Sequence, residues 1–511
     1  MKLSNGVIEL ANKHAKYINE KSVIEEKKKK GQYFTSAAVS QFMASLCNLN
    51  MQKVRLLDPG SGVGTLVTAI IERIVSEDIK IDISVDLYEN DFFVYPYLKE
   101  VMENCKLLME NKGNSFDYKI FQEDFILYNA YLFNETFKEK TLSFTTYDLI
   151  ISNPPYFKVQ KNHIYSQVLR EYVFGQPNVY FMFMAVAEKL LKPSGQLIFL
   201  TPRSYCSGLY FKKFRRIFFK SIQPHQFHVF SSRKNTFVDE NILQENIILN
   251  GYKDKRTKEE IIISTSYGGE VSDSYKENKF ESNLVLFNID GDESVIRLPI
   301  LEQDEKVLKL FDSWDNTLEK MGMNISTGPV VTFRARDAIK SFNEKDTYPL
   351  LYMKHVNKTY VQFPLKGNKE EGIIKNFNNK AILITAKNYV IVKRFSSKEQ
   401  DKRIYASGFL KEKYSYERIG LENHLNYIYK KNDKELSTLE VIGLVSFLNS
   451  QLVNKFFCII NGHTQVNASD LKVMKFPDYN YLLDLGREIE AKRITANEID
   501  DYINKTLVAM I

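Results

Sequence analysis

Residues 54–71, VRLLDPGSGVGTLVTAII, determine the fold of the first half of this chain. Val54–Leu57 is a short apolar run that suits a buried strand, and a helix-like apolar stretch follows the glycines. Gly60, Gly62 and Gly64 let the backbone turn tightly and approach a ligand with no Cβ in the way. A strand, a glycine loop and a helix in this order predict a ligand-binding turn in an α/β sheet.

The alternation of strand-like and helix-like segments extends around this loop, from about Gly31 to Asn250. The apolar runs are VRLLDPG, ISVDLYEND, YKIFQEDF, YDLIISNPP, GQLIFLTP, HQFHVFSS and NIILNGY. Strands that alternate with helices predict an α/β fold with a Rossmann-like, doubly wound and mostly parallel sheet. No helix-length spacer separates the last two runs, so we predict an antiparallel hairpin at the end of that sheet.

Three segments of different composition follow one another. Residues 1–30 read as a charged helix that ends in the basic run Lys27–Lys30, and we predict a helical extension there. Residues 31–300 hold the predicted α/β domain. Over residues 301–511 polar segments rich in Lys and Tyr carry short strands and a few helices, which predicts a second, α+β domain.

The composition is that of a globular protein. The chain has 511 residues, 44% of them hydrophobic, and a formal charge of +7, which permits a polyanionic partner without requiring one. No segment approaches the roughly 20 apolar residues of a membrane span, and the first residues lack the features of a signal peptide. We therefore predict a cytoplasmic protein without a membrane partner.

Cysteine and histidine spacing gives no sign of a metal site. Cys47, Cys105, Cys206 and Cys458 lie far apart and form no CxxC pair, and the seven histidines show no paired ligand spacing. We predict four reduced core cysteines and no bound metal.

Acidic residues stand at the ends of three successive predicted strands. Asp58 opens the glycine loop, where it suits a cationic or amino-bearing ligand and would repel a pyrophosphate. Glu89 can accept the two hydroxyls of a ribose, and Asp124 and Phe125 could take the amino group and cover the ring of an adenine. Together these residues favour a nucleoside with a positive charge and an amino acid tail, a description that S-adenosylmethionine fits.

The fourth strand ends in Asn153-Pro154-Pro155-Tyr156, and proline cannot continue a sheet ladder. The Asn153 side-chain oxygen and the Pro154 carbonyl can both accept from one exocyclic amine. Such a pair favours a nitrogen that attacks a methyl sulfonium. Tyr156 can stack on the base that carries the amine, and a duplex base must be flipped out to reach this pocket.

These motifs resemble the gamma class of adenine-N6 DNA methyltransferases of type II restriction–modification systems. The resemblance begins at GQYFT, residues 31–35, which is similar to the cofactor motif that ends here in Thr35; the family continues with proline, whereas this chain has Ser36, which can cap a helix. It continues through the glycine loop, Glu89, the adenine-binding pair and the NPPY motif. By the same resemblance Phe237 is the second aromatic that stacks on the flipped adenine.

The carboxyl-terminal half resembles the target-recognition domain of this family, at STGPVVTFRA, VKRFSSKEQ, GLENHLNYI and NGHTQVNASDL. Arg and Gln could read base edges there, and Lys could contact phosphates. The candidate DNA-binding residues are Arg334, Arg336, Lys393, Arg394, His463 and Gln465.

The resemblance implies an adenine-specific DNA methyltransferase that acts on double-stranded DNA as a monomer, with any cognate restriction endonuclease on a separate chain. Cytosine-C5 chemistry needs a cysteine that normally follows proline, and the chain has no Pro-Cys pair. Two alternatives stay open: a cytosine-N4 methyltransferase, whose class usually has Ser or Thr at position 153, and a DNA-binding subunit without catalysis.

Overall fold

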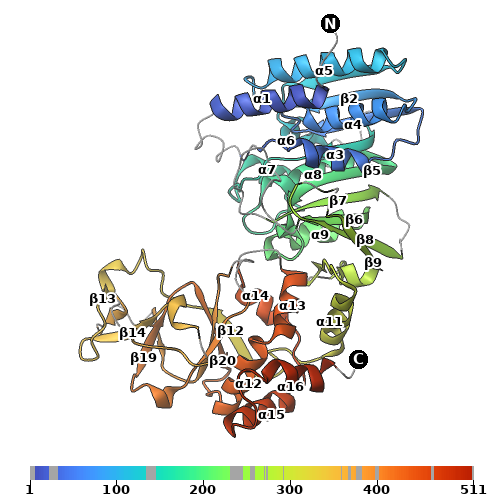
Figure 1. Cartoon of the computed structure of the whole chain (residues 1–511). Helices are drawn as coiled ribbons and strands as arrows, with labels where there is room; N and C mark the ends of the chain where they lie inside the picture. Colours follow the sequence, from blue (N-terminus) through green and yellow to red (C-terminus); the bar gives the residue numbers. More distant parts are fainter. Residues whose placement is uncertain are drawn as a thin grey trace. The chain divides into compact units, whose positions relative to one another are not determined.

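The computed structural model divides the chain into two compact units, Met1–Ile300 and Leu301–Ile511, here called unit 1 and unit 2 (Figure 1). The residues it describes are 6–21, 31, 33–133, 145–230, 245–253, 259–269, 271, 274–291, 293–357, 359–365, 370–375, 382–396, 402–461 and 465–508.

Unit 1 is built around one nine-stranded sheet in the order β3-β2-β1-β4-β5-β7-β6-β8-β9. Its strands are β1 (Lys53–Pro59), β2 (Asp82–Tyr88), β3 (Phe116–Phe121), β4 (Tyr147–Ser152), β5 (Leu191–Pro202), β6 (Ile222–Phe230), β7 (Asn246–Lys253), β8 (Glu260–Ser266) and β9 (Lys276–Glu281). A short pair, β10 (Leu286–Phe287) and β11 (Val295–Ile296), lies outside it.

The helices of unit 1 connect and cover these strands. They are α1 (Val7–Lys21), α3 (Ala37–Ser45), α4 (Thr65–Ser76), α5 (Tyr95–Glu110), α6 (Phe125–Tyr128), α7 (Ile164–Val168), α8 (Val179–Leu190), α9 (Lys212–Phe218) and α10 (Ser282–Val285). Strands β1 to β5 all run parallel, with β1 at the centre of the first five. This confirms the predicted α/β class with a central parallel sheet.

Helices cover both faces of the parallel part of the sheet. The carboxyl-terminal four residues of β1 and of β4 are buried without alternation, as expected for strands covered on both sides. Helices α1, α3, α4 and α5 pack on one another, and α8 packs on α6 and α9. The two groups form the two helical layers of a doubly wound fold.

The predicted hairpin is present, but its place in the sheet differs from the prediction. β6 and β7 pair antiparallel, yet β7 lies between β5 and β6, and β8 and β9 extend the sheet beyond β6. The prediction ended the sheet too early. Glu260–Ser266 and Lys276–Glu281 are polar in part, with alternate residues exposed in β9, so they lack the apolar run that marks a central strand.

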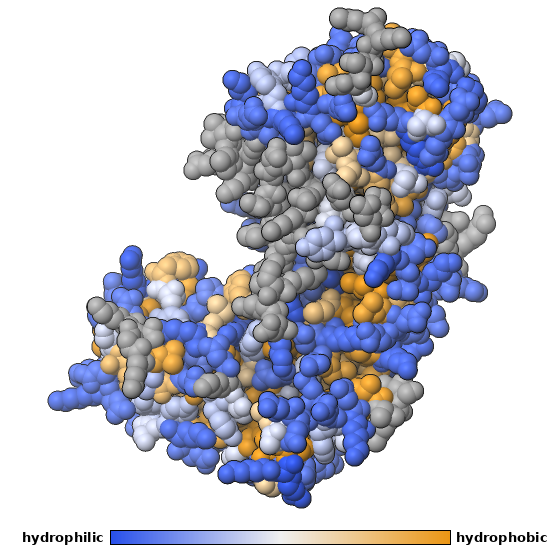
Figure 2. Space-filling model, in the orientation of Figure 1, coloured by the Kyte–Doolittle hydropathy of each residue, from blue (hydrophilic) through white to orange (hydrophobic). Residues whose placement is uncertain are grey.

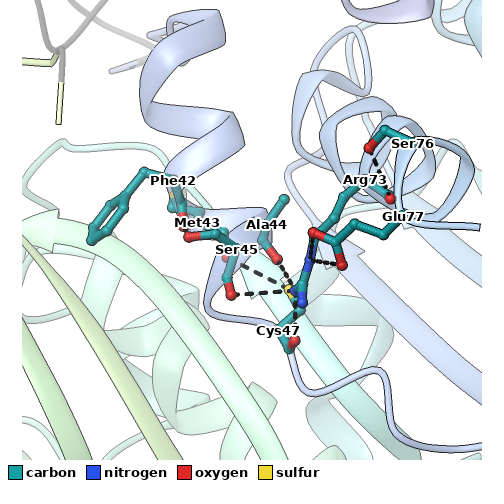
Figure 3. Close-up of polar contacts among 8 residues, drawn as sticks. All are labelled: Phe42, Met43, Ala44, Ser45, Cys47, Arg73, Ser76 and Glu77. Atoms are coloured by element: carbon teal, nitrogen blue, oxygen red, sulfur yellow. Dashed lines mark hydrogen bonds and ion pairs between the residues drawn. The ribbon is translucent and has the colours of Figure 1, made fainter. Parts of the chain in front are cut away.

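Helix α3 is held at both ends by side chains, and Figure 3 shows the contacts at its carboxyl-terminal end. Ser36 is its N-cap and accepts a hydrogen bond from the Val39 backbone N–H, so the cap predicted from sequence is confirmed. At the other end Arg73 of α4 donates through Nη1 to the carbonyls of Ala44, at 2.8 Å, and Cys47, at 2.8 Å. A guanidinium at the last carbonyls of a helix satisfies groups that the helix itself leaves unpaired.

The predicted N-terminal extension is an integral part of unit 1. α1 buries Val7, Ile8, Ala11, Ala15 and Ile18 and packs against α4 and α5. An apolar stripe at helical spacing accounts for this docking. The basic run Lys27–Lys30 lies outside the described residues.

Unit 2 contains two sheets and a group of helices. One sheet has the order β12-β20-β17-β18 and the other β13-β15-β14-β19-β16. The strands are β12 (Met323–Thr327), β13 (Ile339–Lys340), β14 (Thr347–Leu351), β15 (Gly372–Ile374), β16 (Leu383–Thr385), β17 (Tyr389–Lys393), β18 (Ala406–Phe409), β19 (Arg418–Leu421) and β20 (Leu425–Lys430). The helices are α11 (Glu302–Ser313), α12 (Thr438–Leu448), α13 (Gln451–Ile460), α14 (Ala468–Val473), α15 (Tyr479–Glu490) and α16 (Ile499–Thr506).

Two glycines bring α12 and α15 into backbone contact. A Cβ on Gly443 would lie 1.9 Å from the Leu482 carbonyl oxygen, and one on Gly486 would lie 2.4 Å from that of Leu439. Any larger side chain would force these helices apart, so both positions require glycine.

Hydrophilic side chains cover most of the face drawn in Figure 2, with small apolar patches between them. Cys47, Cys105 and Cys206 are buried, whereas Cys458 is exposed, so the prediction of four core cysteines is wrong for that residue. In the described part of the chain no single helix is long and apolar enough to cross a membrane; α12 and α13 reach that length only as a pair bent by 58°.

Candidate active site

A cavity of about 520 Å³ lies at the carboxyl ends of the parallel strands of unit 1, within the range of ligand pockets. It is the place where open α/β sheets bind ligands. Residues predicted from sequence that line it are Thr35, Gly60, Gly62, Glu89, Asp124, Phe125, Asn153 and Pro155.

The glycine loop forms one wall of this cavity through left-handed backbone conformations. Gly60 and Gly62 have φ angles of 74° and 53°, which favour glycine. A Cβ on Gly62 would meet the ring of Phe34 at 3.0 Å, and one on Gly60 would lie 3.8 Å from Pro155 Cδ. The loop is therefore closely packed between the GQYFT segment and the NPPY motif.

Glu89 is buried at the end of β2 and held by backbone donors. Its Oε2 accepts from the Gly62 N–H at 2.9 Å, and its Oε1 accepts from the Asp91 N–H at 2.8 Å. These bonds fix the carboxylate against the glycine loop. Glu89 also lines the cavity, so its carboxylate is at the surface that a ligand would contact.

Asp58 is fully buried and does not line the cavity. Neither of its carboxylate oxygens has a hydrogen-bond partner among the described residues. Burial raises the pKa of Asp58 well above its usual value, and the nearby Glu89 carboxylate raises this pKa further. An unsatisfied buried carboxyl beside a glycine loop is costly unless a donor or a cation completes it.

Asp124 begins α6 and is engaged by two partners. Its Oδ1 caps the helix by accepting from the Leu127 N–H at 2.8 Å, and its Oδ2 accepts from the Tyr165 hydroxyl. The next residue, Phe125, is buried against the rings of Tyr88 and Phe183, 5.0 and 5.1 Å away between centroids. An adenine amine that binds Asp124 would have to share or displace the Tyr165 hydroxyl.

Asn153 has a side-chain orientation that its neighbours determine. Its Nδ2 donates to the Tyr33 carbonyl at 2.9 Å and to Thr35 Oγ1 at 3.0 Å. A carbonyl can only accept, so this contact assigns Nδ2 to that side and Oδ1 to the other. In the described residues no donor reaches the Pro154 carbonyl.

Tyr156 is more enclosed than a base-stacking role suggests. Its ring is 7% exposed and does not line the cavity. Its hydroxyl lies 2.6 Å from Asn153 Oδ1 and 2.9 Å from the Leu200 carbonyl oxygen. Burial raises the pKa of Tyr156 well above its usual value, so the hydroxyl keeps its proton and serves as a donor.

The GQYFT segment joins the two halves of the site, although sequence reasoning assigned it to the cofactor alone. The Gly31 carbonyl accepts from the Tyr156 N–H at 3.0 Å, and a Cβ on Gly31 would lie 2.7 Å from the Tyr156 backbone. Tyr33 and Thr35 hold Asn153, while Phe34 packs on Gly62. Only the tertiary structure reveals these contacts across more than a hundred residues.

Several cavity residues carry no motif that sequence reasoning used. Phe157 directly follows the NPPY motif, and Phe92 stands three residues after Glu89, so their positions could have drawn attention to them. Tyr165 and Phe183 come from helices α7 and α8 with no local signal. Phe237 lies outside the described residues, and its role as a stacking aromatic stays a prediction.

The candidate DNA-binding residues lie in different surroundings in unit 2. Arg334 and Arg336 are exposed. Lys393 donates to Asn357 Oδ1 at 2.6 Å, and Arg394 Nη1 donates to the Asn423 carbonyl at 3.2 Å. Gln465 pairs through its backbone with Phe395. His463 lies outside the described residues.

Comparison with known proteins identifies the family to which this chain belongs. The family profile "Eco57I restriction-modification methylase" matches residues 82–237, which include Glu89, Asp124 and the NPPY motif. The chain is 33% identical over 511 residues to the type II methyltransferase M.BsuBI of Bacillus subtilis, covering 98% of each chain. It belongs to the type II restriction–modification methyltransferases. The type II methyltransferase M.PstI of Providencia stuartii is 30% identical over 485 residues, 94% of each chain.

Solved structures agree on the fold of this type II methyltransferase. The Type ISP restriction-modification enzyme LlaGI, solved as a nuclease-deletion mutant with a DNA substrate mimic, superposes with a TM-score of 0.51 at 12% identity. The match covers 91% of this chain and 55% of that chain. At that identity the likeness concerns the fold alone.

Proposed function

We propose that this type II methyltransferase transfers a methyl group from S-adenosylmethionine to the N6 amine of an adenine flipped out of a short duplex recognition sequence. The observation that carries the proposal is the assigned orientation of Asn153. Its amide nitrogen is committed to Tyr33 and Thr35, so its oxygen is the acceptor of the side chain. We assign the carbonyl of the next residue, Pro154, as the second acceptor. Two acceptors at one position suit an exocyclic amine, which has two hydrogens to donate.

The features of the cavity fit S-adenosylmethionine. Gly60 and Gly62 line the cavity without side chains of their own, Glu89 lines it with a carboxylate that we assign to the ribose, and Phe125 is an aromatic neighbour for the adenine. The unsatisfied Asp58 carboxyl favours a positive group near the loop, because a cation would lower its raised pKa. When bound, S-adenosylmethionine supplies an electrophilic methyl group on a sulfonium.

The chain's own groups act on the amine. Asn153 Oδ1 and the Pro154 carbonyl accept its two hydrogens and direct its lone pair away from them. Bound S-adenosylmethionine would supply its methyl group to the lone pair that these acceptors leave exposed, and the methylated amine would lose one proton to solvent. Transfer is direct and in line, with no covalent enzyme intermediate.

Tyr156 has two functions in this proposal. In the absence of DNA its hydroxyl donates to Asn153 Oδ1 and keeps the acceptor in place. The entering adenine stacks on its ring, together with Phe237, and this offsets part of the stacking lost from the duplex. The proposal therefore requires the Tyr156 ring to become accessible when DNA binds.

Double-stranded DNA is the proposed substrate, and unit 2 the proposed recognition domain. Membership of the type II methyltransferases supports a protective role toward a cognate endonuclease on a separate chain. We further propose that the enzyme acts as a monomer, since one site modifies one strand at a time.

Sequencing of modified bases tests the proposal. The chain is expressed in a host that lacks adenine methylation, next to an Asn153→Ala variant as the matched control. We expect N6-methyladenine confined to one short motif with the wild-type protein and none with the variant. Methylcytosine at a motif would move the enzyme to the N4 class, and unmodified DNA with folded protein would favour a subunit without catalysis.

A further inference from the structure

We propose that His424 reads a base edge of the duplex and that the buried Glu422 determines which imidazole nitrogen faces the DNA. The inference rests on the proposed function and assigns part of its sequence specificity to a residue that is not among the candidate DNA-binding residues named from sequence. His424 lies in the turn between β19 and β20, in the segment GLENHLNYI.

Glu422 contacts both the backbone and the ring of His424. One carboxylate oxygen, Oε2, accepts from the His424 backbone N–H at 2.9 Å, and the other, Oε1, lies 2.9 Å from His424 Nδ1. The Glu422 side chain is 3% exposed, whereas that of His424 is 46% exposed. A buried carboxylate thus holds an imidazole that is half open to solvent.

This arrangement leaves one nitrogen for a ligand. Both oxygens of an ionised carboxylate accept, so Nδ1 carries the hydrogen of a neutral imidazole and Nε2 then carries the lone pair. The proposed contact uses this neutral form. In the described part of the chain Nε2 makes no hydrogen bond. Phe395 packs edge-on against the ring, with centroids 4.9 Å apart and planes at 85°, and limits its rotation.

The turn that carries His424 is tied to its neighbours by backbone hydrogen bonds. The Arg394 N–H donates to the His424 carbonyl at 2.9 Å, and the Asn423 N–H donates to the Val330 carbonyl at 2.8 Å. Arg394 Nη1 adds a bond to the Asn423 carbonyl. An acceptor held this firmly loses little freedom when it binds, which is the condition for a specific contact.

The sheet brings three chain segments to the same end of unit 2. β12 and β17 both pair antiparallel with β20, so Thr327 lies opposite Asn426 and Lys393 opposite Leu425. The segments after β12 and β17 and the turn before β20 therefore emerge together. This convergence places His424 beside the candidate residues Lys393 and Arg394.

The segment after β12 has the chemistry of a nucleic-acid surface. Phe333 is 74% exposed, and the guanidinium of Arg334 lies 5.4 Å from its ring centroid. Arg336, two residues further on, is exposed as well. Exposed arginines beside an exposed aromatic suit contacts with the phosphates of a duplex, so the charge of this segment favours duplex DNA over a protein partner.

A hydrogen-bond acceptor in the major groove discriminates between base pairs by the position of their exocyclic amines. Adenine N6 and cytosine N4 are the major-groove donors, and each base pair presents one of them at a different place. His424 Nε2 is therefore assigned to the amine of one base pair in the recognition sequence.

Methylation rates on matched duplexes test the assignment. Full-length wild type, His424→Ala and Glu422→Gln are compared on the methylated motif found by sequencing and on every single-base-pair variant of it. Arg487→Ala is the control, since Arg487 is an exposed residue of α15 that pairs with Asp484 of the same helix and lies outside the His424 turn. Thermal unfolding of each variant verifies that it is folded.

We expect His424→Ala to lose roughly tenfold discrimination or more at one base pair and to keep it at the others. Glu422→Gln should lose less discrimination than His424→Ala at the same base pair, because the amide oxygen of glutamine can still accept a hydrogen bond from Nδ1. A duplex whose base at that position lacks only its exocyclic amine should slow the wild type but not His424→Ala.

Three results separate the possible failures. Absence of wild-type methylation on any DNA overturns the proposed function. An active wild type with unchanged discrimination in His424→Ala overturns the reading role alone, and leaves a protein partner or a purely structural role for this surface. An equal loss of discrimination in Arg487→Ala and His424→Ala also overturns the reading role, because the effect would then not be specific to the His424 turn.

Discussion

Thr35 connects two parts of the site that sequence motifs treat separately. It lines the cavity beside the glycine loop, and its hydroxyl accepts a hydrogen bond from Asn153 Nδ2. The residue therefore bears on the orientation of the proposed catalytic amide as well as on any ligand in the cavity.

Thr35→Val should lower kcat about fivefold, because the lost hydrogen bond contributes about 1 kcal/mol to holding Asn153. Steady-state methylation kinetics measure this, with Thr35→Ser as the control that keeps the hydroxyl and should retain kcat. An unchanged kcat with a raised KM for S-adenosylmethionine would instead assign Thr35 to the cofactor alone.

His228 makes the stability of unit 1 depend on pH. It is fully buried in β6, its ring nitrogens lie 2.9 Å from Ser264 Oγ and 3.0 Å from Ser266 Oγ, and burial lowers its pKa to about 3. The folded protein thus keeps His228 neutral, whereas the unfolded chain binds a proton below about pH 6.5.

The contribution of the neutral His228 to the free energy of unfolding should therefore be fully present well above pH 6.5. It should fall by about 1.4 kcal/mol per pH unit as the pH decreases from about 6 toward 3. Urea unfolding at pH 7.5, 6.5 and 5.5 measures this against His228→Gln, which cannot titrate. The difference between the two proteins should shrink by about 1.4 kcal/mol from pH 7.5 to 5.5. Parallel pH profiles for both proteins would contradict the assignment.

At the scale of elements, α3 depends on one side chain of α4. Arg73 donates to three carbonyls at the end of α3, those of Ala44, Ser45 and Cys47, and pairs with Glu77 on its exposed side. Since α3 follows directly on Thr35, this contact also supports the GQYFT segment.

Arg73→Met should lower the free energy of unfolding of unit 1 by about 2 kcal/mol or more, because buried carbonyls lose a charged donor. Glu77→Gln is the matched control: it removes only the exposed helix pair and should cost about 0.5 kcal/mol or less. Chemical denaturation measures both. Equal losses of unfolding free energy in the two variants would show that Arg73 stabilises unit 1 through its ion pair with Glu77 and not through the carbonyls at the end of α3.

Elements with a strong local pattern were predictable, and those that tertiary pairing creates were not. The strand, glycine loop and helix over β1 and α4 follow from apolar periodicity and glycine positions. The insertion of β7 between β5 and β6, and the addition of β8 and β9, depend on partners distant in sequence. No local pattern encodes which strand becomes the neighbour of which.

At the scale of the whole molecule, the two units should respond differently to a cofactor analogue. All residues of the predicted cofactor site belong to unit 1. In differential scanning calorimetry, S-adenosylhomocysteine at 100 times its Kd should stabilise only the transition of unit 1, by about 2.7 kcal/mol.

Glu89→Ala is the control for this measurement and should abolish most of the shift. A shift of equal size in the transitions of both units would contradict a cofactor site confined to unit 1. The same result with Glu89→Ala as with the wild type would remove Glu89 from the ribose-binding role.

The sequence by itself determined the α/β class, the turn that carries the glycine loop, and the candidate residues Glu89, Asp124 and Asn153. Each of these depends on local backbone preference and on residue types at strand ends, which are written in short segments. Tertiary structure alone decided that Thr35 holds Asn153, that Tyr156 is enclosed, that Asp58 is buried with no hydrogen-bond partner among the described residues, and that Glu422 contacts His424. Those relations join residues through packing and hydrogen-bond geometry, and such contacts exist only once the chain has folded.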